Sequence, residues 1–327
     1  MVSSKRMDYY KKVSENMMDQ KCINSIVECI MQSDMSDIDF REVKIRPVRY
    51  KLDEEGNEVA MVYDSFCDTL LEKSAMSDAW VAGNLLLFTV FDGYLENKYQ
   101  LIEGESFRKH YEALPENTSM EKIVKNCYRI MKIIRNGIQH NMSNVNCNSD
   151  NYDINYYHRS VSYILKISRN GIKYLYTIIM NTILEQIMGI STKYMTTGHF
   201  EGIIYSWYTE MLNEITQFSD DINTELLIVP NELKIRSTVR YPIENPHVVA
   251  EDETTITFSH MENNMVPDEN NNQYYYSQDY TYKDYLLPQE IGVITWGEGE
   301  TFSERIKEAK ICFYKKNLEE KWKMKSL

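Results

Sequence analysis

Residues 119–140 read SMEKIVKNCYRIMKIIRNGIQH, and the expected fold is built outward from this stretch. Its apolar residues recur at three- and four-residue intervals, which is the spacing of one buried face of a helix. The residues with this spacing are Ile123, Cys127, Ile130 and Ile134. Thr118 or Ser119 can cap the start, and Asn136-Gly137 predicts the end, because glycine tolerates the left-handed conformation that follows many helices. The stretch therefore predicts an amphipathic helix that ends in a loop containing His140.

Helical patterns continue on both sides of this helix, so the sequence predicts a mainly α fold. Ser77 or Asp78 can cap a helix that runs through Leu95, and Pro115 follows a shorter one. The other expected helices cover residues 8–31, 105–114, 154–188 and 200–218. The central part is thus expected to be a helical bundle.

The two ends of the chain have a different pattern. Residues 40–63 predict a β-hairpin, with Pro47 placing its first strand at a sheet edge. After Asp221 the expected strands cover 226–229, 233–239, 254–258 and 291–296, and a charged helix covers 302–325. Residues 1–63 are therefore expected to form an N-terminal helix and hairpin extension. Residues 64–220 are expected to form the helical domain, and 221–327 a mixed α/β sensing or regulatory domain.

Composition limits the classes of protein that remain. The chain has 327 residues and a formal net charge of −13, and its six cysteines form no Cys-x-x-Cys pair. It contains no apolar run near the roughly 18 residues that a membrane helix needs, and no signal-peptide pattern at its start. We therefore expect a cytoplasmic protein with reduced thiols and without a membrane partner.

The charge distribution is uneven, because the segment from Met120 to Tyr174 carries nine basic and only three acidic residues. Phosphate contacts supply much of the affinity for nucleic acid, so this local excess of positive charge predicts an RNA-binding face. The cations expected to track RNA are Lys122, Lys125, Arg129 and Lys132.

Arg135, Asn136 and His140 carry the chemistry that the sequence predicts. Histidine can take or give a proton near neutral pH, and arginine can hold a phosphate and stabilise the charge of a transition state. Together they suit RNA cleavage by attack of the 2′-hydroxyl, for which no metal or other cofactor is required and for which DNA lacks the nucleophile.

The motif Arg135-Asn136-x3-His140, with helices around it, resembles the HEPN (higher eukaryote and prokaryote nucleotide-binding) family. The resemblance covers about residues 64–188 and implies an HEPN-like bundle of four or five helices. It also implies a homodimer in which Arg135 and His140 of both subunits form one composite cleft, with Asn136 supporting them. Members of this family commonly act as toxins or anti-phage effectors, so a phage-derived trigger or an antitoxin is an implied partner.

Two other functions remain open. One is a catalytically inactive HEPN-like dimer that serves as a binding or regulatory module. The other is a Mg²⁺-dependent nuclease centred on Glu42 and Lys44 with Asp39, whose Glu-x-Lys spacing recurs at Glu232 and Lys234. Such triplets are common in a charged chain, and an exposed strand explains them more simply.

Two further groups of residues could be considered as binding sites. Cys127, His140, Cys147 and His158 lack the close ligand pairs of a structural zinc site, so no metal is expected there. Six tyrosines lie between Tyr274 and Tyr285, where either a loop or a protein-binding surface is expected.

Overall fold

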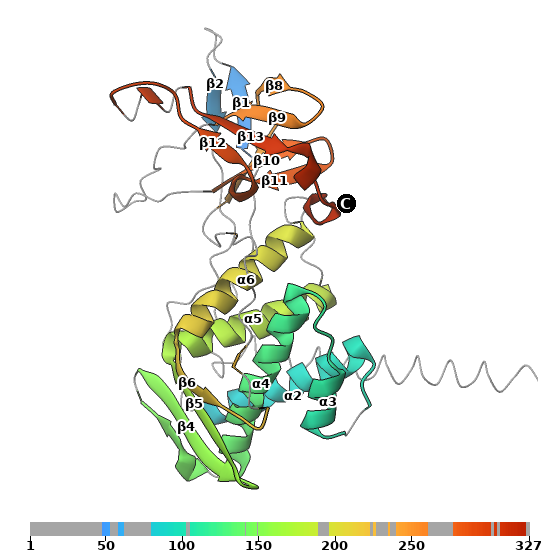
Figure 1. Ribbon diagram of the computed structural model, residues 1–327, viewed down its shortest axis with the longest axis vertical. Helices are drawn as coiled ribbons and strands as arrows, with labels where there is room; N and C mark the ends of the chain where they lie inside the picture. The colour runs from blue at the N-terminus through green and yellow to red at the C-terminus, as the bar shows by residue number, and fades with distance from the viewer. Residues whose placement is uncertain are drawn as a thin grey trace, which may run out of the picture. The chain divides into compact units, whose positions relative to one another are not determined.

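The computed structural model describes most of the chain after residue 79 and two short strands before it (Figure 1). The described residues are 48–52, 58–61, 80–102, 105–140, 142–148, 150–188, 196–222, 225–226, 235, 240–260, 277–301, 304–305 and 308–324. They belong to two compact units. The first takes its described residues from 69–189 and 207–230, and the second from 41–68, 190–206 and 231–327. The helix expected over 8–31, together with Asp39, Glu42 and Lys44, lies outside the described residues.

The first unit combines helices with an antiparallel sheet. Its helices are α2 (Trp80–Tyr99), α3 (Phe107–Ala113), α4 (Ser119–His140), α5 (Arg169–Met188) and the part of α6 (Thr197–Asn213) from residue 207 onward. Its strands, in sheet order, are β3 (Val145–Cys147), β4 (Asn151–His158), β5 (Val161–Ser168) and β6 (Ile215–Ser219), and η1 (Met142–Asn144) is a short 3₁₀ turn. Helix α4 contacts α2, α3 and α5 as well as β4 and β5, so it is the centre of this unit.

Helix α4 starts with a capping box. The Thr118 hydroxyl accepts a hydrogen bond from the N–H of Glu121 at 3.2 Å, and the Glu121 carboxylate accepts one from the N–H of Thr118 at 3.0 Å. Two backbone donors that the helix cannot satisfy are thereby paired. The apolar face expected from the sequence is buried, since Ile123, Cys127 and Ile134 are each 0% exposed.

The segment expected to open a long helix at residue 154 instead forms the hairpin β4–β5. Its eight-residue pairing runs from Asn151 opposite Ser168 to His158 opposite Val161. The two turn residues, Arg159 and Ser160, have φ values of 45° and 64°. Positive φ at both positions suits a tight two-residue hairpin. Alternate side chains on each strand are buried, so the period of this segment is two and not 3.6.

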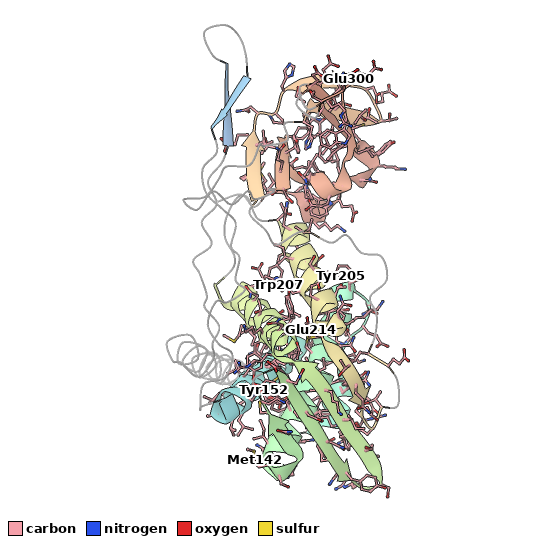
Figure 2. The ribbon with its side chains drawn as sticks, turned by 90° about the vertical axis from the view of Figure 1, so that its left-hand side faces the viewer. Met142, Tyr152, Tyr205, Trp207, Glu214 and Glu300 are labelled. Atoms are coloured by element: carbon pink, nitrogen blue, oxygen red, sulfur yellow. The ribbon has the colours of Figure 1, made fainter. Side chains whose placement is uncertain are left out.

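Figure 2 shows where this sheet meets the helices. Tyr152, labelled there, is 1% exposed and lies among the packed side chains at that junction. A helix does follow the hairpin, but it begins only at Arg169. Likewise, the helix expected to reach residue 218 ends at Asn213, because Ile215–Ser219 pairs with β5 as the edge strand β6.

The second unit contains two sheets. A five-stranded mixed sheet has the order β11 (Tyr285–Pro288), β10 (Ser277–Tyr282), β7 (Arg240–Glu244), β1 (Val48–Leu52) and β2 (Glu58–Met61). A four-stranded antiparallel sheet has the order β12 (Val293–Thr295), β13 (Lys310–Tyr314), β9 (Thr255–Ser259) and β8 (Val248–Glu251). Its 3₁₀ turns are η2 (Gln289–Ile291), η3 (Lys315–Asn317) and η4 (Glu320–Trp322).

An aromatic core joins the two sheets of the second unit. Tyr280 on β10 lies with its ring centroid 5.7 Å from Phe258 on β9 and 5.6 Å from Phe313 on β13. All three side chains are at most 1% exposed. Tyr280 and Tyr282 therefore belong to a strand and its core, which corrects the expectation of a tyrosine-rich loop or binding surface for these two residues.

The expectation of a mainly α, HEPN-like helical bundle is wrong. Five α-helices and three β-sheets are present in the described residues, so the fold combines both classes. The expected hairpin near the N-terminus is present as β1 and β2, but β1 lies between β7 and β2 and is not an edge strand. The strands β9 and β12 are where the sequence predicts them, whereas β13 replaces the expected C-terminal helix.

A buried ion pair holds α4 against the end of β6. The Arg129 guanidinium donates two hydrogen bonds to the Asp220 carboxylate, from Nε at 2.9 Å and from Nη2 at 2.8 Å. Nη1 donates a third to the Glu225 carbonyl at 3.3 Å, and the guanidinium carbon lies 5.1 Å from the centre of the Phe218 ring. The Arg129 and Asp220 side chains are 1% and 0% exposed. Each charge therefore depends on the other for its solvation.

Asp220→Asn should lower the free energy of unfolding by about 3–5 kcal/mol, because it leaves the Arg129 charge buried without a counterion. Urea denaturation checks this. The matched control is Glu112→Gln, which breaks an ion pair with Arg108 whose side chains are 49% and 58% exposed. Loss of such an exposed pair should cost less than about 1 kcal/mol. Equal effects of the two variants would contradict the role given to the buried pair.

The second unit should lose stability in mild acid through His260. This side chain is 4% exposed, and burial lowers its pKa to about 4 from the usual 6.5. The unfolded chain therefore takes up the proton first as the pH falls below about 6.5, and stability declines until about pH 4, by up to about 3 kcal/mol. Urea titrations at several pH values should show a smaller decline for His260→Gln. The exposed His247→Gln should behave as the unchanged protein does.

Candidate active site

Arg135 lies in the last turns of α4 and is half-buried. Its guanidinium carbon stands 5.7 Å from the centre of the Phe88 ring on α2. This separation is within the range of a cation–π contact. Its Nη1 donates a hydrogen bond of 2.7 Å to the side-chain oxygen of Asn136. The stacking ring and the neighbouring amide thus both fix the direction of the guanidinium.

His140 is the last residue of α4 and is exposed. Met142, which is labelled in Figure 2 and is 46% exposed, begins the short turn that follows. Five residues of an α-helix subtend about 140° after whole turns are removed, and advance about 7.5 Å along the axis. Arg135 and His140 therefore leave the same helix in different directions. A single copy of α4 does not bring them together over one phosphate.

The helix passes through Asn136-Gly137, so the predicted end at that pair is wrong. Gly137 is buried where β4 and the chain before it press against α4. A Cβ at this position would stand 2.8 Å from Cγ2 of Ile154 and 3.2 Å from Cγ2 of Val145. The glycine therefore serves close packing of helix on sheet and does not serve as a left-handed cap.

Three of the four cations predicted to track RNA are bound inside the first unit. Lys125 donates to the Leu114 carbonyl at 3.0 Å. Lys132 donates to the Asp221 carboxylate at 2.6 Å, and Arg129 is held by Asp220 as described above. Charges so neutralised add little to the attraction of a phosphate.

Lys122, the fourth of these cations, is half-buried near the start of α4. The helical rise places it roughly 20 Å along the axis from Arg135. The positions of these four residues therefore add no support to the prediction that they contact RNA.

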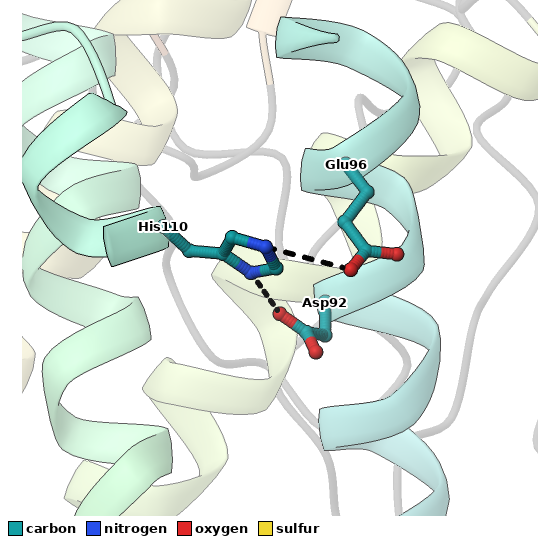
Figure 3. A group of neighbouring side chains, drawn as sticks. All are labelled: Asp92, Glu96 and His110. Carbon is teal, nitrogen blue, oxygen red and sulfur yellow. Dashed lines mark hydrogen bonds and ion pairs between the residues drawn. The ribbon is translucent and has the colours of Figure 1, made fainter. Parts of the chain in front are cut away.

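A polar cluster that the sequence does not predict lies beside Arg135. Asp92 and Glu96 stand one turn apart on α2, and His110 comes from α3 (Figure 3). Nδ1 of His110 is 3.4 Å from the Asp92 carboxylate, and Nε2 is 3.6 Å from that of Glu96. Tyr128 of α4 donates its hydroxyl proton to Asp92. Four polar side chains from three helices therefore meet at one place.

Arg135 acts electrostatically on this cluster. Burial raises the pKa of Tyr128, the negative charge of Asp92 and the hydrogen bond to it raise it further, and the positive charge of Arg135 opposes this. Tyr128 also stacks on Phe88, with ring centroids 6.0 Å apart. The i, i+4 spacing of Asp92 and Glu96 is readable in the sequence, whereas the approach of His110 depends on how α3 folds back.

The four residues considered as a zinc set do not form one. Of all His, Cys, Asp and Glu side chains in the described ranges, the ones grouped closely enough to hold a metal ion are Asp92, Glu96 and His110. Cys127 is fully buried in the apolar face of α4, where burial raises the pKa of its thiol. It is a core residue.

Comparison of the chain with known protein families, with curated proteins and with solved structures found no match. The helices among the described residues include none with the length and apolar character needed to span a membrane.

Gly137→Ala should destabilise the first unit by about 1–3 kcal/mol, although alanine ordinarily favours a helix interior over glycine. The new methyl group would meet Ile154, which is buried and branched at Cβ and so cannot move aside cheaply. Thermal unfolding measures the loss. A double variant that also carries Ile154→Ala should lose less stability than the sum of the losses in the two single variants. Strict additivity would argue against the contact.

Proposed function

We propose that this chain is a metal-independent endoribonuclease of the type that the HEPN resemblance implies, with Arg135 and His140 as its catalytic residues and Asn136 as a positioning residue. One observation carries the proposal. Along α4, Lys125, Arg129 and Lys132 pair with carboxylates, whereas Arg135 pairs with no carboxylate among the described residues and is instead directed by Asn136. A half-buried, oriented guanidinium that makes no direct ion pair with a described carboxylate suits the binding of a phosphate.

The proposed reaction is an attack of the RNA 2′-hydroxyl on the adjacent phosphorus. A histidine accepts the 2′-hydroxyl proton as the new O–P bond forms, and the bond to the 5′-oxygen breaks when that oxygen receives a proton. The products are a 2′,3′-cyclic phosphate and a 5′-hydroxyl. Arg135 would bind the non-bridging oxygens and stabilise the additional negative charge of the transition state.

A homodimer would supply both proton-transfer groups. Because Arg135 and His140 point about 140° apart around one helix, a site with both on one phosphate is reached more readily when two copies of α4 face each other. His140 of one subunit could then act as the base and His140 of the partner subunit as the acid. This dimer, like the cytoplasmic setting and the role as a toxin or defence effector, is part of the proposal.

Purified protein should cleave single-stranded RNA in the presence of EDTA, and His140→Ala and Arg135→Ala should each slow cleavage by at least about 100-fold. His158→Ala is the matched control, since His158 is also an exposed histidine of the first unit and should leave the rate unchanged. RNA carrying a single 2′-deoxy substitution at the cleavage position should resist.

Two results would overturn the proposal. One is cleavage by His140→Ala at the unchanged rate, which would move the chemistry elsewhere. The other is the loss of all cleavage in EDTA while circular dichroism shows an intact fold, which would favour a metal-dependent nuclease. If light scattering shows only monomer at micromolar concentration, the composite site shared by two subunits is excluded.

A further inference from the structure

We propose that Asp92, Glu96 and His110 form a binding site for one divalent transition-metal ion, with Zn²⁺ or Mn²⁺ as the fitting species. The site lies in the first unit, between α2 and α3 (Figure 3). The Tyr128 hydroxyl of α4 is 3.4 Å from His110 Nδ1. It is separate from the proposed cleavage chemistry, in which no metal takes part. The ion would connect α2 and α3 and so support the region that positions Arg135.

The hydrogen bonds of His110 indicate which nitrogen would bind the ion. Nε2 lies 2.9 Å from the Ile102 carbonyl. A carbonyl can only accept, so Nε2 carries the proton. A histidine that donates one N–H to a backbone carbonyl has its other nitrogen fixed in direction, as metal-binding histidines commonly do. In the neutral ring, which is the form that binds metal ions, Nδ1 is therefore the nitrogen with an available lone pair.

Nδ1 is poorly satisfied by the protein itself. His110 is 3% exposed, so water reaches it little. Its nearest polar neighbours are Asp92 Oδ1 and the Tyr128 hydroxyl, each at 3.4 Å. That separation is longer than an ordinary hydrogen bond. The Tyr128 proton is already donated to Asp92. Nδ1 of this buried ring thus faces a carboxylate oxygen at a distance longer than that of an ordinary hydrogen bond.

The distance between His110 Nδ1 and Asp92 fits a metal ion between them better than a direct ion pair. Charge-assisted bonds from an imidazolium to a carboxylate are usually about 2.7–2.9 Å long. Neither carboxylate approaches the ring that closely. Two ligands about 2.1 Å from a tetrahedral zinc ion stand about 3.4 Å apart. Nδ1 and Asp92 Oδ1 have this separation, at 3.4 Å. One ligand atom from each of the three residues lies within 4.8 Å of the others. The Glu96 carboxylate is 3.6 Å from Nε2, the protonated nitrogen, so its side chain would have to turn to reach an ion bound at Nδ1.

The types of ligand atom and the exposure of the two carboxylates indicate which ions fit this site. Imidazole favours Zn²⁺ and related ions, and two carboxylates also suit Mn²⁺. The Asp92 and Glu96 side chains are 30% and 21% exposed, so an ion can enter from solvent and keep water at a remaining position. The i, i+4 spacing on α2 lets both carboxylates reach the same side of the helix.

Metal binding is measured on the full-length protein after dialysis against EDTA and then against metal-free buffer. Calorimetric titration with ZnCl₂ or MnCl₂ alone should give one site per chain that is lost in Asp92→Asn and in Glu96→Gln. At about 100 times the dissociation constant the ion should raise the melting temperature of the unchanged protein by on the order of 5 °C. The amide of the Asp92→Asn variant keeps an oxygen acceptor for Tyr128, so that variant should fold even where His110→Gln does not.

Controls separate this site from the proposed active site. Glu112→Gln, which changes an exposed carboxylate on α3, should retain the metal-dependent shift, as should His140→Ala. Binding that persists in His140→Ala while cleavage is lost would support both proposals independently. The metal site is refuted if neither ion shifts the melting temperature of the unchanged protein, or if Asp92→Asn and Glu96→Gln show the same shift as the unchanged protein.

Discussion

Two opposite charges that are both removed from water set the arrangement of the first unit. The Arg129 guanidinium and the Asp220 carboxylate are solvated almost entirely by each other and by the backbone around them. Dehydrating such a pair costs several kcal/mol for each ion, so it is tolerated only when nearly every donor and acceptor is matched. That requirement fixes the end of β6 against α4, and through β6 it fixes the rest of the antiparallel sheet.

The same arrangement determines which cations of α4 have an acidic partner. Those that face the segment after β6, or the turn before the helix, meet acidic partners there, as Lys132 meets Asp221 and Lys125 meets Glu116. Arg135 lies farther along the helix, against the aromatic ring of Phe88 and its own neighbour Asn136. A stretch that is predominantly basic in sequence thus becomes a helix with neutralised sections and one oriented charge. Local charge counts could not have separated these residues, because their carboxylate partners are up to 91 positions away.

The sequence predicts those helices and strands that are determined by residues close together in the chain. The helices at 80–99 and 119–140 follow from their apolar spacing, although the second runs past its predicted end at Asn136-Gly137, and the strand at 255–259 follows from its composition. The hairpin at 151–168 is not predicted, because its apolar run merges with that of α5 and its turn residues, Arg159 and Ser160, carry none of the usual glycine or asparagine signals. Arg135 and His140 are recognisable as a motif. The meeting of His110 with Asp92 is a tertiary event that spacing along the chain does not encode.

Close packing at Gly137 reaches beyond its contribution to stability. With only a hydrogen atom between the helix and Ile154, α4 has almost no freedom to turn about its own long axis. The directions in which the Arg135 and His140 side chains leave the helix are therefore set by a glycine, which has no functional group. A substitution there would re-aim two side chains at once, through the shape of the backbone and not through any change in charge.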